Sequence, residues 1–260
     1  MKIKEVAETL ERFAPLPLQE GYDNAGLQIG LTDADASGIL LCLDVTEEVI
    51  EEAASLGCNM VIAHHPLLFR SIKCISDATQ VERCVRMAIL NNITIYAAHT
   101  NLDNAYEGVN FEIAKRIGLQ NIAFLQELPN GSGGSGIIGE LPSPEAPEDF
   151  LKRIQQIFKV ACIKHNALPK QNVQRIAICG GAGESLLPTA VKNQADVFIT
   201  GEMSYHRYFG WENKILIAEL GHYQSEQFTI SLMAKILKAT HPELNIKESC
   251  INTNPIHYLC

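Results

Sequence analysis

Three histidine-containing stretches follow apolar runs that have the character of strands. They are "AHHP" at 63–66, "HTNLD" at 99–103 and "GHYQSE" at 221–226. Imidazole nitrogens and carboxylate oxygens are the usual protein ligands of Zn, Mn, Fe, Ni and Co. Because ligands bind beyond the carboxyl ends of the strands in open α/β sheets, these side chains are candidates for a divalent-metal site.

The spacing within the stretches indicates how two ions would be shared. His222 and Glu226 are four residues apart at the start of an expected helix, which places both on one face. Adjacent His64 and His65 would point to opposite faces of a regular strand, and Pro66 ends that regularity. The two rings are therefore able to serve two different ions, and a carboxylate from the set would bridge those ions.

The ordinary role of a buried histidine is a hydrogen-bonded core residue. A single histidine–carboxylate pair would be weak grounds for departing from that interpretation. Three strand ends that carry such residues, spread over both halves of the chain, favour a metal site. The chain has eight histidines, so scarcity does not force this selection.

The elements that must position these residues alternate between strands and helices. Strand-like runs at 38–45, 60–65 and 93–99 are separated by helical patterns at 46–57 and 79–91. The alternation resumes in the second half, and a shift of 136 residues gives the two halves a weak similarity. We therefore expect two related α/β lobes with mixed, largely parallel sheets, and a metal site in the cleft between them.

The middle of the chain has a different composition. Residues 128–149 are rich in Gly, Pro and Ser, which predicts a loop between a first lobe at 1–127 and a second lobe at 128–260. A hairpin turn at "GSGGSG" is the alternative for this segment. A late strand-like piece, "NIKESCI", is expected to return to the first lobe.

The composition excludes several classes of function. A net charge of -9 argues against a general affinity for nucleic acid or for an anionic membrane. No apolar run approaches the ~20 residues of a membrane span, and the first residues lack the apolar stretch expected of a signal peptide. The eight cysteines contain no CxxC pair. A cytoplasmic protein with reduced thiols is the expectation.

Three further motifs have alternative roles. "CGGAGES" at 179–185 follows a strand and opens a helix, where backbone N–H groups could hold a phosphate. It lacks the lysine of a P-loop, which favours a tight turn. Asp23 and Asn24 either contact a substrate or form a turn or helix cap. Glu202 and His206 either support the site, in an acid–base or indirect role, or form ordinary hydrogen bonds.

As a set, the motifs resemble those of the GTP cyclohydrolase 1 type 2 homologues, also called dinuclear metal centre, hexameric ring proteins. The three histidine stretches occur in the family's order with "YDNAGLQIG" at 22–30, "CGGAGES" and "ITGEMSYH" at 199–206. The resemblance spans nearly the whole chain and implies the short form, without an inserted middle domain. It also implies a toroidal homohexamer. The two divalent metals that it implies are bound by His64, His65, Asp103, His222 and Glu226, with His99 near the ions.

Two classes of function are compatible with these residues. The first is a metal-dependent hydrolase that acts on a nucleotide or a phosphoester, with His99 or Glu202 moving a proton. The family name adds GTP ring opening by analogy. The alternative is a non-catalytic metal-binding ring that acts as a scaffold, a metal carrier or a regulatory partner. An open coordination position would favour the enzyme, whereas the ligand types do not decide among the metals.

Overall fold

The computed structural model describes residues 1–259, which divide into two units that are each built from separate stretches of chain. Unit 1 comprises Met1–Leu102 and Thr229–Pro255, and unit 2 comprises Asp103–Phe228 with the residues from Ile256 onward. This division differs from the boundary expected at 127/128, because most of the Gly- and Pro-rich segment is a strand of unit 2. Cys260, one of the eight cysteines expected to be reduced, lies outside the described residues.

Unit 1 contains a five-stranded sheet of order β1-β4-β3-β2-β11. The central strands pair in parallel, and each is buried along its whole length, as strands covered on both faces must be. β11 adds to β2 in parallel, and β1 pairs with β4 in the antiparallel direction. The strands are β1 (Gly26–Ile29), β2 (Ile39–Cys42), β3 (Met60–Ala63), β4 (Thr94–Ala97) and β11 (Ile246–Glu248).

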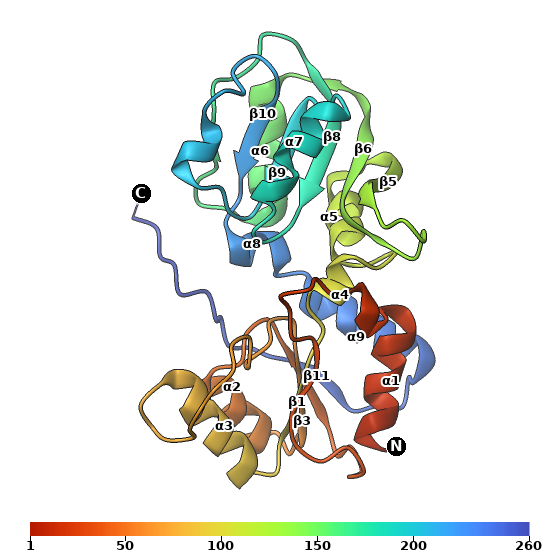
Figure 1. Cartoon of the computed structure of the whole chain (residues 1–260), viewed down its shortest axis with the longest axis vertical. Helices are drawn as coiled ribbons and strands as arrows, with labels where there is room; N and C mark the ends of the chain where they lie inside the picture. Colours follow the sequence, from red (N-terminus) through yellow and green to blue (C-terminus); the bar gives the residue numbers. More distant parts are fainter. Residues whose placement is uncertain (260) are drawn as a thin grey trace. The chain divides into compact units, whose positions relative to one another are not determined.

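The long helices of unit 1 cover both faces of this sheet. They are α1 (Ile3–Phe13), α2 (Glu47–Ser55), α3 (Gln80–Leu90) and α9 (Thr229–Thr240). Alternate strand residues such as Leu40 and Val61 pack with the buried faces of α2 and α3 in one apolar cluster. Figure 1 shows α1 and α9 together on the opposite face. No helix in the described part of the chain has both the length and the apolar character needed to cross a membrane.

Unit 2 contains a six-stranded sheet of order β5-β6-β8-β9-β10-β7. β8, β9 and β10 pair in parallel, and the other neighbours pair in the antiparallel direction. The strands are β5 (Gln120–Glu127), β6 (Gly134–Glu145), β7 (Lys164–His165), β8 (Val173–Cys179), β9 (Val197–Thr200) and β10 (Leu216–Glu219). The helices are α5 (Val109–Ile117), α6 (Pro147–Phe158), α7 (Leu187–Lys192) and α8 (His222–Glu226). α7 packs with Ala177, Phe198 and Ile217 on one face of the sheet.

The Gly-rich segment forms a β-hairpin, so the hairpin turn is the correct one of the two interpretations offered for it. β5 and β6 pair with Gln126 opposite Ser135, and the chain turns between them at 128–133. A Cβ atom on Gly134 would lie 2.6 Å from the carbonyl oxygen of Gln126. Glycine is therefore present because the neighbouring backbone approaches closely, which composition alone does not distinguish from a flexible loop.

Each unit has three neighbouring parallel strands at its centre. The register pairs Ile39 with Met60 in unit 1 and Ile176 with Val197 in unit 2. Equivalent positions are therefore 137 residues apart (39 to 176, 60 to 197), one more than the shift that the sequence suggested. The expected fold class of two related α/β units with mixed sheets is confirmed.

Candidate metal centre

Three histidines gather at one edge of the unit 1 sheet. His64 and His65 directly follow β3, and His99 lies two residues after β4. Because β3 and β4 are parallel, with Ala63 opposite Ala97, their carboxyl ends lie at the same edge. One ligand nitrogen from each of the three histidines lies within 4.8 Å of the others. The sequence predicted His64 and His65 as ligands and His99 as catalytic, and all three belong to one donor set.

An oxygen acceptor orients each of these three imidazole rings at Nδ1. The acceptors, at 2.7–2.8 Å, are the Ala98 carbonyl oxygen for His64, Asp44 Oδ1 for His65 and Asp23 Oδ1 for His99. Carbonyl and carboxylate oxygens only accept hydrogen bonds, so Nδ1 carries the hydrogen and Nε2 carries the lone pair of each neutral ring. Metal-binding histidines are usually held in this way, with the remaining nitrogen as the ligand.

Two aspartates that hold these rings are themselves anchored. Asp44 also accepts a hydrogen bond of 2.6 Å from the Thr253 hydroxyl. Burial raises the pKa of the Asp44 carboxyl, but hydrogen bonds from His65 and Thr253 outweigh burial and lower it. Burial likewise opposes ionisation of Asp23, whose hydrogen bonds from His99 and Thr100 lower its pKa to about 2. Both groups are therefore ionised acceptors at neutral pH.

Sequence reasoning missed Asp44, and it left Asp23 undecided between a substrate contact and a turn or cap. Asp44 lies two residues beyond β2, which is the same signal that identified the histidines after the other parallel strands. Asp23 follows no strand. Its contact with His99 joins residues 76 positions apart, so only the folded chain reveals it.

Unit 2 brings His222 and Glu226 together on α8. His222 Nε2 lies 3.1 Å from Glu226 Oε2, and its Nδ1 lies 2.9 Å from Glu202 Oε1. With Nδ1 donating to Glu202, the Nε2 lone pair of a neutral His222 faces a carboxylate oxygen, which is repulsive unless a proton or a cation lies between them. The side chain of Glu226 is only 4% exposed, so burial increases the need for such a charge. This pair fits a divalent metal.

The glycine-rich turn makes room for that carboxylate. Gly181 has φ +60, and a Cβ atom there would lie 2.3 Å from Glu226 Oε1. The N–H groups of Gly180 and Gly181 donate to Asn110 Oδ1 and Ser225 Oγ, at 2.9 and 3.0 Å. Because side chains already accept hydrogen bonds from these N–H groups, the turn is not a phosphate loop. It is a tight turn that lets the backbone approach Glu226 closely, in agreement with the favoured interpretation.

The remaining predicted ligand, Asp103, ends the short helix α4 (Thr100–Asp103), which begins directly after His99. Its side chain is partly exposed, and Asn110 donates to its backbone carbonyl at 3.2 Å. The donor types found in the two units are neutral imidazole Nε2 atoms and carboxylate oxygens. These donors suit Zn, Mn, Fe, Ni and Co alike, so they fit a divalent metal without selecting one.

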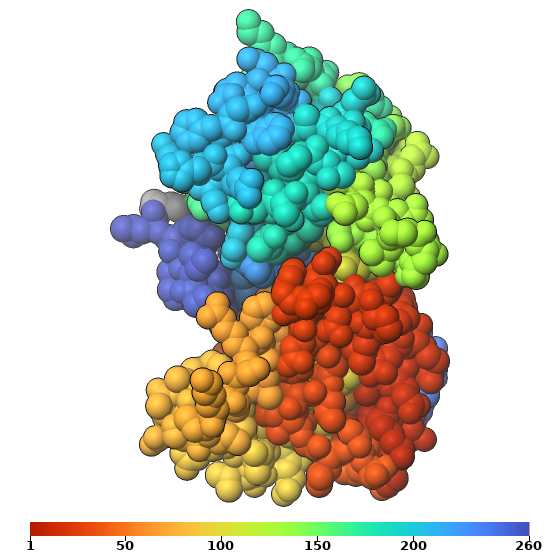
Figure 2. Space-filling view, viewed as in Figure 1, coloured from red at the N-terminus to blue at the C-terminus, as the bar shows by residue number. Residues whose placement is uncertain are grey.

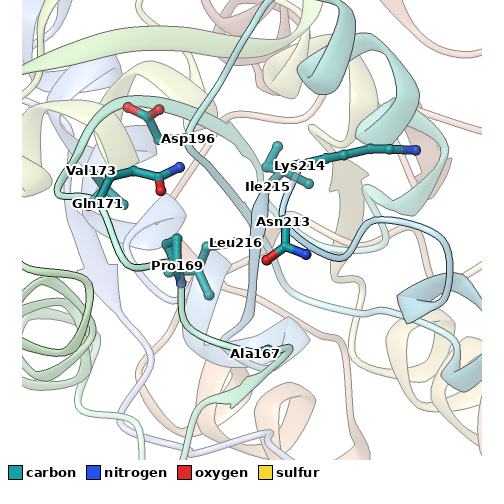
Figure 3. A pocket seen from close by; sticks show the side chains of 9 residues that line it. All are labelled: Ala167, Pro169, Gln171, Val173, Asp196, Asn213, Lys214, Ile215 and Leu216. Carbon is teal, nitrogen blue, oxygen red and sulfur yellow. The ribbon is translucent and has the colours of Figure 1, made fainter.

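A separate hollow of about 30 Å³ lies at the amino ends of the parallel strands of unit 2, and Figure 3 shows its lining. Asp196 is the acidic residue in this lining, and its Oδ2 accepts hydrogen bonds of 2.8 Å from the N–H groups of Gln174 and Arg175. The side chain that could bind a ligand is thus engaged by the backbone of the sheet itself. It is therefore a structural feature of the sheet edge rather than a second candidate site.

Comparison with known proteins identifies similar chains over the full length. The family model described as Duf34/NIF3 (NGG1p interacting factor 3) matches residues 1–255. A "GTP cyclohydrolase 1 type 2 homolog" from Lactococcus lactis is 32% identical over 258 residues, which cover 99% of each chain. One of the same name from Clostridium acetobutylicum is 30% identical, covering 95% of this chain and 93% of that protein. The crystal structure of Staphylococcus aureus protein SA1388 superposes with a TM-score of 0.91 at 27% identity, covering 100% and 99% of the two chains.

Proposed function

The chain belongs to the Duf34/NIF3 family, and from that premise we propose that it is a dinuclear divalent-metal protein that hydrolyses a nucleotide or a phosphoester. One observation carries the proposal. Four imidazoles, in two units, each bond through Nδ1 to an oxygen acceptor at 2.7–2.9 Å, so that Nε2 is the nitrogen with the lone pair. In this proposal two ions are bound by His64, His65, Asp103, His222 and Glu226.

Bound divalent ions supply positive charge that acidifies water and stabilises negative charge on a substrate oxygen. The chain's own residues have two tasks beside them. Asp44 and Glu202 hold the rings of His65 and His222 in the tautomer that presents Nε2. The Asp23 carboxylate accepts the Nδ1 hydrogen of His99 and fixes the ring so that it presents Nε2, the atom that would accept and return a proton. This is the catalytic role that we propose for His99.

The relatives named GTP cyclohydrolase 1 type 2 homolog add GTP ring opening to the reactions that need testing. We propose the broader class of nucleotide and phosphoester hydrolysis for this chain, because its donor set suits charge stabilisation on either kind of substrate. A toroidal homohexamer and a cytoplasmic location are further proposals. A sedimentation mass of six 28.6 kDa chains would support the hexamer, and a mass of one or two chains would contradict it.

The test is metal analysis of the purified protein, followed by a screen of nucleotides and phosphoesters with each metal found. His65→Ala and Glu226→Ala should each lose bound metal and at least ~100-fold of the turnover. His257→Ala removes an exposed histidine outside the donor set and is the matched control. Full activity in an Ala variant that holds no metal would contradict the mechanism. A metal-filled protein with no turnover would contradict hydrolysis and leave the non-catalytic metal-binding ring.

A further inference from the structure

Two aromatic side chains lie exposed beside the histidine cluster of unit 1. Tyr22 is 68% exposed and Phe69 is 45% exposed. Their ring centroids are 6.3 Å apart with an interplanar angle of 70°, and the Phe69 ring lies 6.2 Å from the His99 ring at 85°. Large aromatic side chains left in water next to a polar site commonly mark a surface that binds something. The pair therefore requires an explanation beyond core packing.

Hydrogen bonds hold the backbone segments that carry Tyr22 and Phe69 against each other. The Asn24 side-chain amide donates to the Leu68 carbonyl at 2.8 Å, and the Leu68 N–H donates to Gln28 Oε1 at 3.1 Å. Between Tyr22 and Asn24, Asp23 holds His99. The residues that follow Tyr22 thus tie it to the histidine loops. A rigid mounting lowers the entropy lost when a ligand binds, as expected of a binding surface.

The same loop carries positive charge without an internal partner. Arg70 and Lys73 follow Phe69, both are exposed, and within residues 1–259 neither forms an ion pair. The chain as a whole has a net charge of -9, and among the residues that the structure describes five of the eight arginines pair with carboxylates. The amber segment after β3 lies at the surface of unit 1 in Figure 2. An exposed arginine that directly follows Phe69 in the chain and has no ion-pair partner within residues 1–259 is suited to an anionic group such as phosphate.

We propose that Tyr22 and Phe69 bind a flat heteroaromatic ring of the substrate beside the histidine cluster, while Arg70 attracts the substrate's phosphate. The inference rests on the proposed function and narrows its substrate class to phosphates that carry an aromatic base, as opposed to simple phosphoesters. Aromatic side chains bind any base through its π-face, so the pair fixes the ring without selecting one base. The ring then lies next to His99, the residue proposed to move the proton.

Equilibrium binding to the metal-loaded protein tests this. The probes are adenosine 5′-(α,β-methylene)diphosphate and methylenediphosphonate, which share the bridged phosphonate group and differ by the nucleoside. Tyr22→Ala and Phe69→Ala should each weaken binding of the nucleotide analogue by roughly 5- to 100-fold and change binding of methylenediphosphonate by less than about twofold. Arg70→Ala should weaken both. Leu90→Ala, which removes another side chain of unit 1 that is 75% exposed, is the control and should change neither.

A conservative variant provides an optical readout. Tyr22→Trp keeps an aromatic face and adds a second tryptophan to a chain that has one, so it should bind the nucleotide analogue normally and show quenched fluorescence on binding. Equal loss of both probes in the Ala variants, unchanged nucleotide affinity, or a wild type that binds the two probes equally would overturn the ring site. A changed sedimentation mass with unchanged affinity would instead make the rings a subunit contact.

Metal content separates this inference from the proposed function. The hydrolase proposal fails if the wild type holds no divalent metal or converts no nucleotide or phosphoester. The ring site is contradicted by the binding data described above even when every variant holds its metal.

Discussion

The imidazole of His65 donates from Nδ1 to Oδ1 of Asp44 over 2.7 Å, and the other oxygen of that carboxylate accepts the hydroxyl of Thr253. The aspartate therefore sets both the direction of the ring and the nitrogen that it presents. Asp44→Ala should weaken metal binding by about 10- to 100-fold while the chain stays folded. Metal titration monitored by calorimetry measures this.

Asp33→Ala is the matched control for that variant, because Asp33 pairs with Lys4 at the surface, far along the chain from the histidines. Unchanged metal affinity in Asp44→Ala would show that the carboxylate does not position the ligand. Thr253→Val should have a smaller effect in the same direction, since it leaves the Asp44–His65 hydrogen bond in place.

Removal of metal should destabilise the protein. Without a cation, the Nε2 lone pair of neutral His222 faces the buried carboxylate of Glu226. A metal that binds only the folded state, at a free concentration 100 times its dissociation constant, adds about 2.7 kcal/mol to the free energy of unfolding. We expect a chelator to lower Tm and a returned divalent metal to restore it. Glu226→Gln removes the repulsion, so its chelator-treated form should be more stable than the chelator-treated wild type. A Tm indifferent to chelator would argue against resident metal.

Substitution of Gly181 should lower the free energy of unfolding, and a second variant separates the contact with Glu226 from the backbone strain. Gly181→Ala places a Cβ atom 2.3 Å from Glu226 Oε1 and also strains a residue with φ +60. Gly57 has φ +70 with no atom within 4 Å of such a Cβ, so Gly57→Ala reports the backbone strain alone. We expect a loss of about 1 kcal/mol for Gly57→Ala and roughly 1–3 kcal/mol more for Gly181→Ala. Equal losses in denaturant unfolding would show that Glu226 adapts freely.

The stability contribution of Asp23 should depend on acidic pH. Its pKa in the folded chain is lowered from 3.8 to about 2, so its ionised form stabilises the fold above about pH 4. This contribution to the free energy of unfolding is lost as the pH falls from about 4 to about 2, because the Asp23 carboxyl then becomes protonated in the folded chain. Asp23→Asn should cost on the order of 1–2 kcal/mol at pH 7, because the Asp23 side chain is shielded from solvent where it accepts these hydrogen bonds. Urea unfolding of both proteins should show this difference shrink below pH 4, and a constant difference would contradict the assignment.

The sequence predicted the residues at the ends of the parallel strands well, because their positions depend on local patterns. Apolar runs such as Met60–Ala63 are buried on both faces, and a polar residue directly after such a run lies at a sheet edge whatever the rest of the fold. His64, His65 and His99 gather for this reason.

The interactions that orient those residues could not be predicted. Asp23 reaches His99 across 76 positions, and Thr253 reaches Asp44 across 209, so both contacts exist only after distant segments have packed. The choice between a loop and the hairpin of β5 and β6 stayed open for a related reason. Glycine at 134 is typical of a loop, but here it is required because the backbone of Gln126 approaches it closely.

The parallel pairing of β11 with β2 has a consequence for the order of events during synthesis. Unit 1 is completed by residues that leave the ribosome after the whole of Asp103–Phe228, so unit 2 can close around its core while unit 1 still lacks an edge strand. Thr253 arrives with this last segment. The hydrogen bond from Thr253 that supports Asp44, and through it the His65 ring, therefore forms only after the whole of Asp103–Phe228 has been synthesised.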